Sequence, residues 1–302
     1  MRVAVTGATG TIGRVVVREL AARGDEVVAL SRDPARAEAA LGGSARPAAW
    51  SDPAHQPAPA DALAGCDGVI HLAGEELAQR WTDAAKRRIR ESRELGTRNL
   101  VAGLRAADPR PRVLVSQSAE GIYPRGGALA GEDTPPGSGF LSEVVQAWER
   151  EARAAEELGM RVAIARTGVV LSRAGGALPK MLFPFKLGVG GPVAGGSQPF
   201  PWVDVEDSAG ALIFLLDHDE ARGPVNVVAP DKHTNKTFTK ALGRVIHRPT
   251  VVPVPALAMT TLYGEMATTV LEGSNPDPAK LLSLGYEFRH PTLEEALRVE
   301  LG

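Results

Sequence analysis

Short apolar runs and longer amphipathic runs alternate along the first half of the chain. Residues 1–6 and 26–30 are rich in β-branched side chains and predict strands, whereas residues 14–23 place apolar side chains at helical spacing. The glycine-rich segment 7–13 separates the first strand from this helix. The start of the chain therefore predicts a strand, a glycine turn, a helix and a second strand, which together form a βαβ unit.

The alternation continues to about residue 165. Apolar runs at 68–73, 112–116 and 161–165 predict buried strands, and the segments 82–107 and 141–158 predict long helices. Two segments rich in glycine and proline predict loops: 42–60 and 124–139. Strands that alternate with helices are typical of a parallel sheet with helices on both faces. We therefore expect an α/β fold with a doubly wound sheet of the Rossmann type.

The pattern changes near residue 170, because the segment 172–200 is dense in glycine, proline and phenylalanine. Further elements are predicted as helices at 178–187, 204–217, 235–246 and 293–301, a short strand at 225–228 and an extended segment at 249–255. We expect residues 1–170 to form the Rossmann-type domain, with later segments around 204–230 returning to it. Residues 171–203 and 231–302 are expected to form a smaller lobe that covers the substrate.

Composition and charge narrow the function classes. The chain has 302 residues, of which 44% are hydrophobic and 23% charged, as in ordinary globular proteins. The net charge of -2 gives no electrostatic reason to expect a nucleic-acid partner. Cys66 is the only cysteine and no cluster has metal-ligand spacing, so we expect neither a disulfide nor a metal site. No apolar run is long enough to span a membrane and the chain opens on a strand, which favours a cytoplasmic protein.

Three glycines lie between the first strand and the first helix. Gly7, Gly10 and Gly13 have the spacing G-x-x-G-x-x-G, within a complete strand, turn and helix. Glycine allows the tight turn and the close approach of the backbone to a pyrophosphate, and the helix N-terminus offers free N–H groups to the phosphates. The alternative is a purely structural turn. The context favours a dinucleotide site.

The end of the second strand indicates which dinucleotide binds. An acidic residue there would hold the ribose hydroxyls and repel a 2′-phosphate. This strand ends instead in Leu30-Ser31-Arg32, and a guanidinium can form a forked, charge-assisted pair with phosphate. A solvated surface role for Arg32 is the alternative, and the neighbouring Asp33 complicates the pattern. We predict NADP(H) in preference to NAD(H).

Several motifs in order resemble the extended short-chain dehydrogenase/reductases. The narrower resemblance is to their atypical, epimerase-like subgroup, an NAD(P)-dependent epimerase/dehydratase-like family with a C-terminal domain of unknown function. It is carried by the segments 6–13, 71–75, 80–81, 92–93, 140–143, 166–171, 188–192, 202–207, 226–230 and 284–288. These motifs cover nearly the whole chain and together are highly specific.

The resemblance implies which residues contact the cofactor. They are Gly7, Thr9, Gly10, Thr11, Ile12, Gly13, Ser31, Arg32, Leu72, Ala73, Gly74, Arg93, Ser116, Thr167, Gly168 and Val169. Within this set, Ser31 and Arg32 take the ribose phosphate. Arg93 reaches toward the cofactor from the long helix, although its sequence position fits equally well a solvated residue or an ion-pair partner of Glu91 or Glu94.

The usual catalytic groups of the superfamily are incomplete in this chain. Typical members use a serine after the fourth main strand and a Tyr-x-x-x-Lys pair at the start of the next helix, where the tyrosine transfers the proton. Ser118 matches the serine better than Ser116 does. Phe140 and Val144 stand where tyrosine and lysine are expected. The narrower family also lacks this pair, so the proton donor has to be sought elsewhere.

Three residues are candidates for the missing chemistry. Ser118 is predicted to polarise the substrate oxygen, and Tyr123 brings a phenol to the loop after the same strand. A ring that only packs beneath this loop is the alternative for Tyr123. Glu120 is a carboxylate that could act as an acid or a base in an apolar pocket. Glu143 is a further carboxylate, for which stabilisation of a helix N-terminus is the simpler interpretation. His71 ends a buried strand and is interpreted as structural.

Aromatic residues of the second half predict a wall over the cofactor. We expect Lys180, Phe183, Phe200 and Trp202 to line the substrate pocket, with core packing as the alternative for the aromatic rings. These residues favour a small, mostly apolar carbonyl or alcohol substrate.

Three functions follow from these observations. The first is an NADP(H)-dependent oxidoreductase acting on a small molecule. The second is a nucleotide-sugar-like or other epimerase or isomerase that keeps its cofactor bound. The third is a non-enzymatic regulatory protein that senses NADPH, which the missing tyrosine and lysine favour. The expected partner is a small molecule, with neither nucleic acid nor membrane, and the chain is expected to be a monomer or a homodimer.

Overall fold

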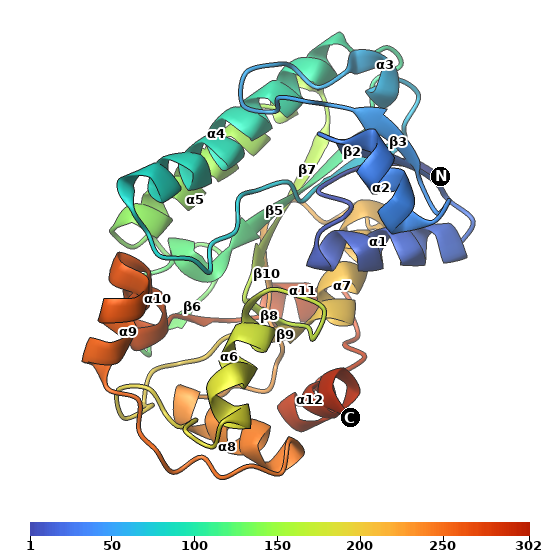
Figure 1. Cartoon of the computed structure of the whole chain (residues 1–302). Helices are drawn as coiled ribbons and strands as arrows, with labels where there is room; N and C mark the ends of the chain where they lie inside the picture. Colours follow the sequence, from blue (N-terminus) through green and yellow to red (C-terminus); the bar gives the residue numbers. More distant parts are fainter.

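Seven parallel strands form the central sheet of the computed structural model, which describes residues 1–302 (Figure 1). The sheet is built of β1 (Arg2–Thr6), β2 (Glu26–Ser31), β3 (Arg46–Ala49), β4 (Gly68–His71), β5 (Val113–Ala119), β7 (Arg161–Thr167) and β10 (Gly223–Val227). Their order is β10-β7-β5-β4-β1-β2-β3, and every neighbouring pair is parallel. The chain leaves β1 first toward β2 and later toward β4, so the order reverses between β1 and β4. A crevice for a ligand is expected at this reversal.

Helices cover both faces of the sheet. One face carries α1 (Thr11–Ala22), α2 (Pro34–Leu41) and α7 (Val205–Asp217), and the other carries α3 (Ala60–Leu63), α4 (Asp83–Ala106) and α5 (Phe140–Arg153). Short 3-10 helices follow β5 at Glu120–Ile122 and follow α5 at Glu156–Leu158. The doubly wound Rossmann-type fold predicted from the sequence is confirmed.

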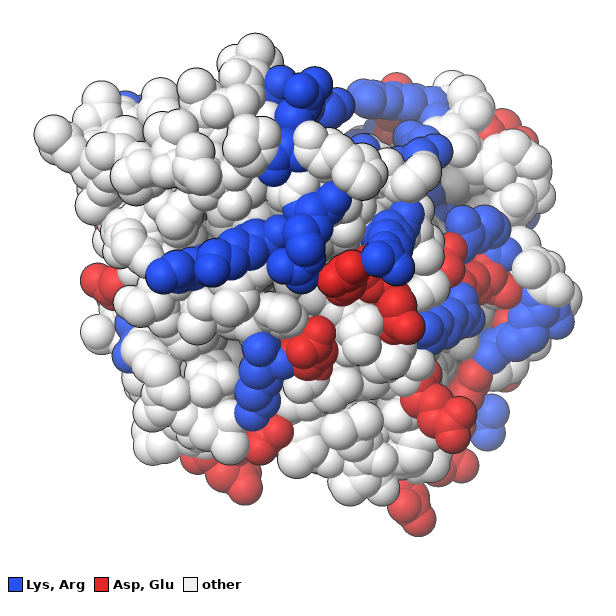
Figure 2. Space-filling view, turned by 90° about the horizontal axis from the view of Figure 1, so that it is seen from below, with Lys and Arg blue, Asp and Glu red and all other residues white.

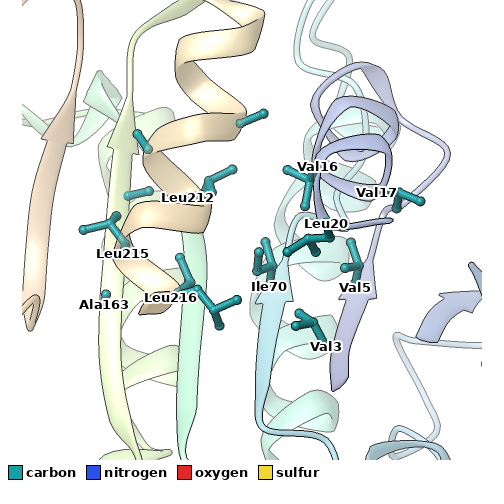
Figure 3. Packing of buried hydrophobic residues seen from close by; sticks show 14 of the residues in the cluster. Val3, Val5, Val16, Val17, Leu20, Ile70, Ala163, Leu212, Leu215 and Leu216 are labelled. Atoms are coloured by element: carbon teal, nitrogen blue, oxygen red, sulfur yellow. The ribbon is translucent and has the colours of Figure 1, made fainter. Parts of the chain in front are cut away.

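The first core lies between the sheet and the α1–α7 layer. Val16, Val17 and Leu20 of α1 recur at helical spacing and point onto Val5 and Ile70 of the strands (Figure 3). Each of these side chains is fully or almost fully buried. Burial of one such aliphatic side chain contributes about 1.5–3 kcal/mol, so this layer stabilises the sheet that carries the glycine turn.

A smaller lobe lies below the carboxyl ends of the strands in Figure 1. It contains β8 (Val169–Leu171), β9 (Trp202–Asp204), α6 (Ala177–Lys186), α8 (Asn235–Val245), α9 (Ala256–Tyr263), a 3-10 turn (Gly264–Met266), α10 (Ala267–Glu272) and α12 (Leu293–Leu301). Its own core includes Phe185, Trp202, Phe238 and Leu293. A two-stranded pair, β6 (Leu129–Ala130) with β11 (Asn275–Pro276), joins the loop after β5 to the C-terminal region.

Late segments of the chain return to the first domain. β10 is the edge strand of the central sheet, and α7 packs against β4, β5 and β7 of that sheet. The segment around 204–230 therefore lies with the Rossmann unit. One further return was not expected. The short helix α11 (Ala279–Ser283) contacts β10, and Leu281 and Tyr286 belong to the first core rather than to the lobe. Asp207 holds this tail, because it accepts hydrogen bonds from the Tyr286 hydroxyl and from the Arg289 and His290 amides.

No helix is both long and apolar enough to cross a membrane. The structure also has no group of three or more histidine, cysteine, aspartate or glutamate side chains arranged to hold a metal ion. Cys66 is a buried, free thiol in the second core, where burial raises its pKa.

Candidate functional site

The glycine turn is shaped so that side chains do not fit at two of its positions. Gly7 has a φ of +67°, and a Cβ atom there would lie 2.8 Å from the Leu72 carbonyl carbon. A Cβ atom at Gly13 would lie 2.2 Å from the Gly7 carbonyl oxygen. The Gly10 amide donates to that same oxygen at 2.9 Å and closes the turn. Only glycine allows β1, β4 and α1 to approach one another this closely.

The start of α1 is open to a ligand. Gly10 is the N-cap and has no side chain to accept from the first amides of the helix, so the positive end of the helix dipole is left without a side-chain cap. Thr9 and Ile12 lie half-buried beside this end. Gly175, on the loop after β8, packs against the Thr11 hydroxyl. The predicted phosphate-binding turn is therefore bordered by a loop of the lobe.

The residue that follows β2, Arg32, is a cation without an ion-pair partner. Arg32 is exposed and has no ion-pair partner, whereas Asp33 is the N-cap of α2 and accepts from the Arg36 amide at 3.0 Å. The Ser31 hydroxyl bonds to the Asp33 backbone, donating to its carbonyl at 3.0 Å and accepting from its amide at 3.1 Å. Asp33 is thus committed to the helix, and its carboxylate does not pair with Arg32.

The end of β4 is fixed by a buried hydrogen-bond chain. The Thr6 hydroxyl accepts from the Leu72 and Ala73 amides at 3.1 Å and lies 2.7 Å from His71 Nδ1. His71 Nε2 lies 3.0 Å from the Thr97 hydroxyl on α4. Complete burial lowers the pKa of His71 to about 4, so the ring is neutral near pH 7. His71 therefore holds the strand end in place, as expected of a structural residue.

Arg93 is a buried cation without a carboxylate partner. Its side chain is 7% exposed, and its Nη1 donates to the Glu75 and Ile89 carbonyls. The guanidinium lies 5.1 Å from the centre of the Trp148 ring and against Gly74 at the end of β4. Burial lowers its pKa to about 10. It is neither a solvated residue nor an ion-pair partner of Glu91 or Glu94, and it borders the predicted cofactor segment.

The ends of β5 and β7 bring the remaining predicted cofactor residues close together. Val169 N donates to the Pro201 carbonyl at 2.8 Å and Gly168 N to the Val227 carbonyl at 3.2 Å, which holds the turn from Thr167 to Val169 against β9 and β10. Ser116 is buried on β5 and its hydroxyl donates to the Gln117 carbonyl. The Gln117 side-chain oxygen is buried without a hydrogen-bond partner.

Ser118 belongs to a buried polar network beneath these strand ends. Its hydroxyl donates to Glu149 Oε1 at 2.7 Å. Arg166 donates to both oxygens of the same carboxylate at 2.8 Å, from Nε and Nη2. All three side chains are buried. The Ser118 hydroxyl is therefore occupied by a buried carboxylate on α5.

Tyr123 extends this network across the sheet. Its hydroxyl donates to Asn226 Oδ1 at 2.6 Å and accepts from Arg166 Nη1 at 3.0 Å. Asn226 Nδ2 in turn donates to the carbonyl of Ala130 on β6 and to the carbonyl of Asp277, just after β11. Burial raises the pKa of the Tyr123 phenol. The ring is fully buried, so the network anchors the loop after β5 and the C-terminal region to the central sheet.

Glu120 occupies a different position. Its carboxylate accepts from the Ser274 hydroxyl and lies 4.0 Å from Arg125 Nη1. The positions of the usual tyrosine and lysine hold packing residues, since Phe140 meets Trp81 edge-on at 5.1 Å and Val144 is fully buried. Glu143 is exposed and pairs with Arg90 on α4.

The residues predicted to line the substrate pocket do not form one wall. Trp202 is buried in the lobe core and its Nε1 donates to the Asp231 carbonyl at 2.8 Å, and Phe200 stacks on Phe238 at 4.0 Å. Phe183 is 66% exposed on α6. Lys180 donates to Glu76 Oε1 and to the Ala78 carbonyl, and so ties α6 to the loop after β4. Core packing therefore accounts for the two central aromatic rings.

A large cavity of about 800 Å³ lies between the Rossmann unit and the lobe. Its lining has one hydrophobic residue and consists of Arg125, Gly126, Gly127, Ser197, Gln198, Pro199, Lys232, His233, Thr234, Thr237, Leu271, Glu272 and Asn275. Arg125 belongs to the loop after β5 and Lys232 to the loop after β10, and none of the residues predicted to contact the cofactor lines the cavity. Arg125 Nη1 is buried without a hydrogen-bond partner.

Comparison with known protein families matches most of the chain. Residues 3–229 match the NAD dependent epimerase/dehydratase family, and residues 254–299 match a domain of unknown function, DUF1731. This chain belongs to the NAD-dependent epimerase/dehydratase family. The family resemblance seen in the sequence motifs is therefore confirmed.

Individual relatives are similar over the full length. The mouse epimerase family protein SDR39U1 is 38% identical over 306 residues, which cover 99% of each chain. A chloroplastic homologue from Arabidopsis thaliana is 36% identical and covers 99% of this chain and 86% of the relative. The crystal structure of human SDR39U1 isoform 2 with NADPH is 34% identical, covers 99% of both chains and has a TM-score of 0.88. Because one relative is chloroplastic, a cytoplasmic location stays a prediction.

Three functional features of the site were not found from the sequence. Gln117 and Arg125 carry no local pattern, since a glutamine in a strand and an arginine in a glycine-rich loop are ordinary. Glu149 gives a signal that could have been used, because it lies on the buried face of α5 beside Val145 and Trp148. A charged residue on such a face needs a buried partner.

Proposed function

We propose that the protein is an NADP(H)-dependent oxidoreductase that acts on a small polar molecule. The observation that carries the proposal is the arrangement along one edge of the sheet. Arg32 follows β2, the open start of α1 follows β1, and the turn from Thr167 to Val169 follows β7, so these three features lie at the carboxyl ends of parallel strands of one sheet. The polar cavity is lined in part by the loops after β5 and β10 of the same sheet. Such an arrangement fits a dinucleotide along the strand ends with a substrate beyond it.

The residues present fit the cofactor. Arg32 would hold the 2′-phosphate, and the amides at the start of α1, which no side chain caps, would hold the pyrophosphate. Arg93 and the Leu72–Ala73–Gly74 backbone would border the ribose. When bound, NADP(H) supplies or accepts a hydride at the nicotinamide. Support comes from the human relative solved with NADPH.

We assign positioning roles to Ser118 and Tyr123. Both hydroxyls are buried and donate to other side chains of the network, so neither is available to a substrate oxygen. Through Asn226 and Glu132 they fix the loop that carries Arg125 to the sheet. Glu120 is the proposed acid or base, because its carboxylate adjoins Arg125, which lines the cavity.

The polar cavity favours a different substrate from the one predicted by the aromatic residues. Its lining provides hydroxyl and amide groups together with Arg125, Lys232, His233 and the carboxylate of Glu272. The Arg125 Nη1 atom is buried without a hydrogen-bond partner, whereas most of the other lining residues are exposed or half-buried. An oxygen-rich, anionic carbonyl or alcohol compound therefore fits better than a mostly apolar one.

Two further functions each rest on a specific observation. An epimerase of nucleotide-sugar-like or other substrates is favoured by the family match and by the polar cavity. An NADPH-sensing regulatory protein is favoured by Phe140 and Val144, which replace the usual proton-transfer pair with apolar side chains. The oligomeric state, monomer or homodimer, stays a prediction.

An activity assay with the purified protein tests the proposal. The protein is incubated with NADPH and a panel of hydroxylated carbonyl compounds, some with and some without phosphate or carboxylate groups. We expect loss of the nicotinamide absorbance with at least one anionic member. Isomerised product without net loss of NADPH would support the epimerase, and binding without any conversion would support the sensor. Glu120→Gln should retain NADPH affinity and lose turnover, and the exposed Glu143→Gln is its control.

A further inference from the structure

One helix of the lobe is apolar and yet exposed. The helix α9, Ala256–Tyr263, has no charged residue and no buried residue. Leu257 is 76% exposed and Leu262 is 65% exposed. A helix with uncharged residues on all sides is normally covered by another surface.

Neighbouring segments extend this apolar surface. Leu187 and Val189 follow α6, Val251 and Val252 precede α9, and all four side chains are exposed. The two segments lie side by side, because Gly191 packs against the Val252 carbonyl and Val193 pairs with Val254. We call these four residues together with Leu257 and Leu262 the apolar rim. No charged residue occurs in 187–203 or in 249–264.

A basic groove adjoins the apolar rim. Lys240 and Arg244 on α8 and His247 and Arg248 just after it line a hollow of about 560 Å³ that has no hydrophobic lining residue. Arg244 pairs with Glu294, whereas Lys240 and Arg248 are exposed and have no ion-pair partner. Figure 2 shows this side of the lobe, with Lys and Arg across the middle and an expanse almost free of charge on the α9 side.

We infer that this face binds the surface of an anionic lipid bilayer. Protruding aliphatic side chains of the apolar rim enter the boundary between headgroups and acyl chains, and the cations of the basic groove pair with lipid phosphates. No segment spans the bilayer in this arrangement. The inference is independent of the proposed function.

Two other occupants fit the surface less well. A second copy of this chain related by two-fold symmetry would bring the same basic groove close to its own copy and oppose like charges. A short acidic peptide would need an apolar groove for its own side chains, whereas the rim residues protrude and the groove is lined only by polar residues. A bilayer accepts protruding apolar side chains next to cations.

Co-sedimentation of the full chain with vesicles tests this inference. The vesicles are phosphatidylcholine alone or phosphatidylcholine mixed with phosphatidylglycerol. We expect the protein to bind the anionic vesicles. Its affinity for the neutral vesicles should be lower by about tenfold or more, and its affinity for the anionic ones should fall with added salt. Lys240→Glu with Arg248→Glu should remove most of this binding, as should Leu257→Asp with Leu262→Asp.

Matched controls lie elsewhere on the surface. Arg87→Glu on α4 reverses an exposed, unpaired cation, and Leu282→Asp on α11 replaces an exposed leucine, and both should bind vesicles like the wild type. NADPH affinity and thermal unfolding report that each variant is folded.

Three outcomes would overturn the inference. One is the absence of wild-type binding to anionic vesicles. Another combines two results: the wild type binds no vesicles, and it self-associates in light scattering whereas the Leu257→Asp, Leu262→Asp variant does not. This combination would assign the rim to a second copy. The third is binding that depends on Lys240 and Arg248 but not on the two leucines, which would assign the groove to a soluble polyanion.

Discussion

At the residue scale, the contacts of a side chain decide between its alternatives. Asp33 follows Arg32 in the sequence, and sequence alone leaves open whether its carboxylate neutralises the guanidinium. In the structure it caps α2 at the Arg36 amide, and Arg32 is left free. For Arg93 the structure excludes the solvated alternative. This residue belongs to a highly charged helix, yet its side chain is buried beside Gly74.

Replacing Arg32 should change the cofactor preference. Arg32→Ala is expected to weaken NADPH binding by about 1.5–3 kcal/mol, the contribution of a charged hydrogen bond, and to leave NADH binding nearly unchanged. Fluorescence titration with both nucleotides measures this effect. Arg36→Ala, an exposed arginine on α2, is the control. An equal loss of both affinities would remove Arg32 from 2′-phosphate recognition.

Removing the charge of Glu149 should destabilise the fold. Glu149→Gln leaves the buried Arg166 guanidinium without a compensating charge, at a cost of about 3–5 kcal/mol in the free energy of unfolding. Denaturant unfolding measures the loss. Glu143→Gln breaks an exposed pair with Arg90 and should cost no more than about 1 kcal/mol. Similar losses in both variants would contradict a structural role for the buried network.

At the element scale, periodicity predicted the long elements and missed the shortest ones. The helix expected at 82–107 is α4, Asp83–Ala106, because its apolar face and its Thr82 cap are both local features. The edge strand β3 and the strand β6 fall in segments that were expected as loops, and no element was predicted at β11. Strands of two to four residues have no period of their own, and their hydrogen-bond partners lie far away in the sequence.

The glycine turn provides a test at this scale. Gly13→Ala should abolish dinucleotide binding, because its Cβ would lie 2.2 Å from the Gly7 carbonyl oxygen and would force β1 and α1 apart. Gly96→Ala in α4 is the matched control, since its Cβ would meet no heavy atom within 4 Å. That variant should gain about 1 kcal/mol of stability from its helix propensity. Calorimetric titration and thermal unfolding measure both effects.

At the scale of the whole molecule, the site arises where distant segments meet. The residues that line the polar cavity come from the loop after β5, the segment before β9, the loop after β10 with the start of α8, and the end of α10 with β11. The sequence motifs predicted the cofactor edge, because its residues follow consecutive strands. They gave no indication of the cavity, and Trp202, which was predicted to line the pocket, is packed in the lobe core.

Asp204 makes the junction of the two units sensitive to pH. It ends β9, caps α7 through Oδ1, and has a buried Oδ2 without a hydrogen-bond partner. Burial raises its pKa from 3.8 to about 6, so its contribution to stability is full below pH 3.8 and is lost as the pH rises through 6. The free energy of unfolding should fall by up to about 3 kcal/mol over this range.

The variant Asp204→Asn should not show this pH-dependent fall in the free energy of unfolding. Denaturant unfolding of the variant and the wild type at several pH values measures the difference. His71 acts in the opposite sense in both proteins, because its lowered pKa removes stability as the pH falls from 6.5 toward 4. Subtracting the two curves therefore isolates Asp204. Parallel curves would contradict the buried, uncompensated carboxylate.

The central claim is that this chain binds NADP(H) along the edge that leads from Arg32 to the polar cavity. Calorimetric titration of the wild-type protein with NADPH and with NADH tests it most directly. We expect one site per chain and an NADPH affinity at least about tenfold higher than that for NADH, as a charged hydrogen bond to the 2′-phosphate implies. Equal affinities, a preference for NADH, or no binding of either nucleotide would contradict it.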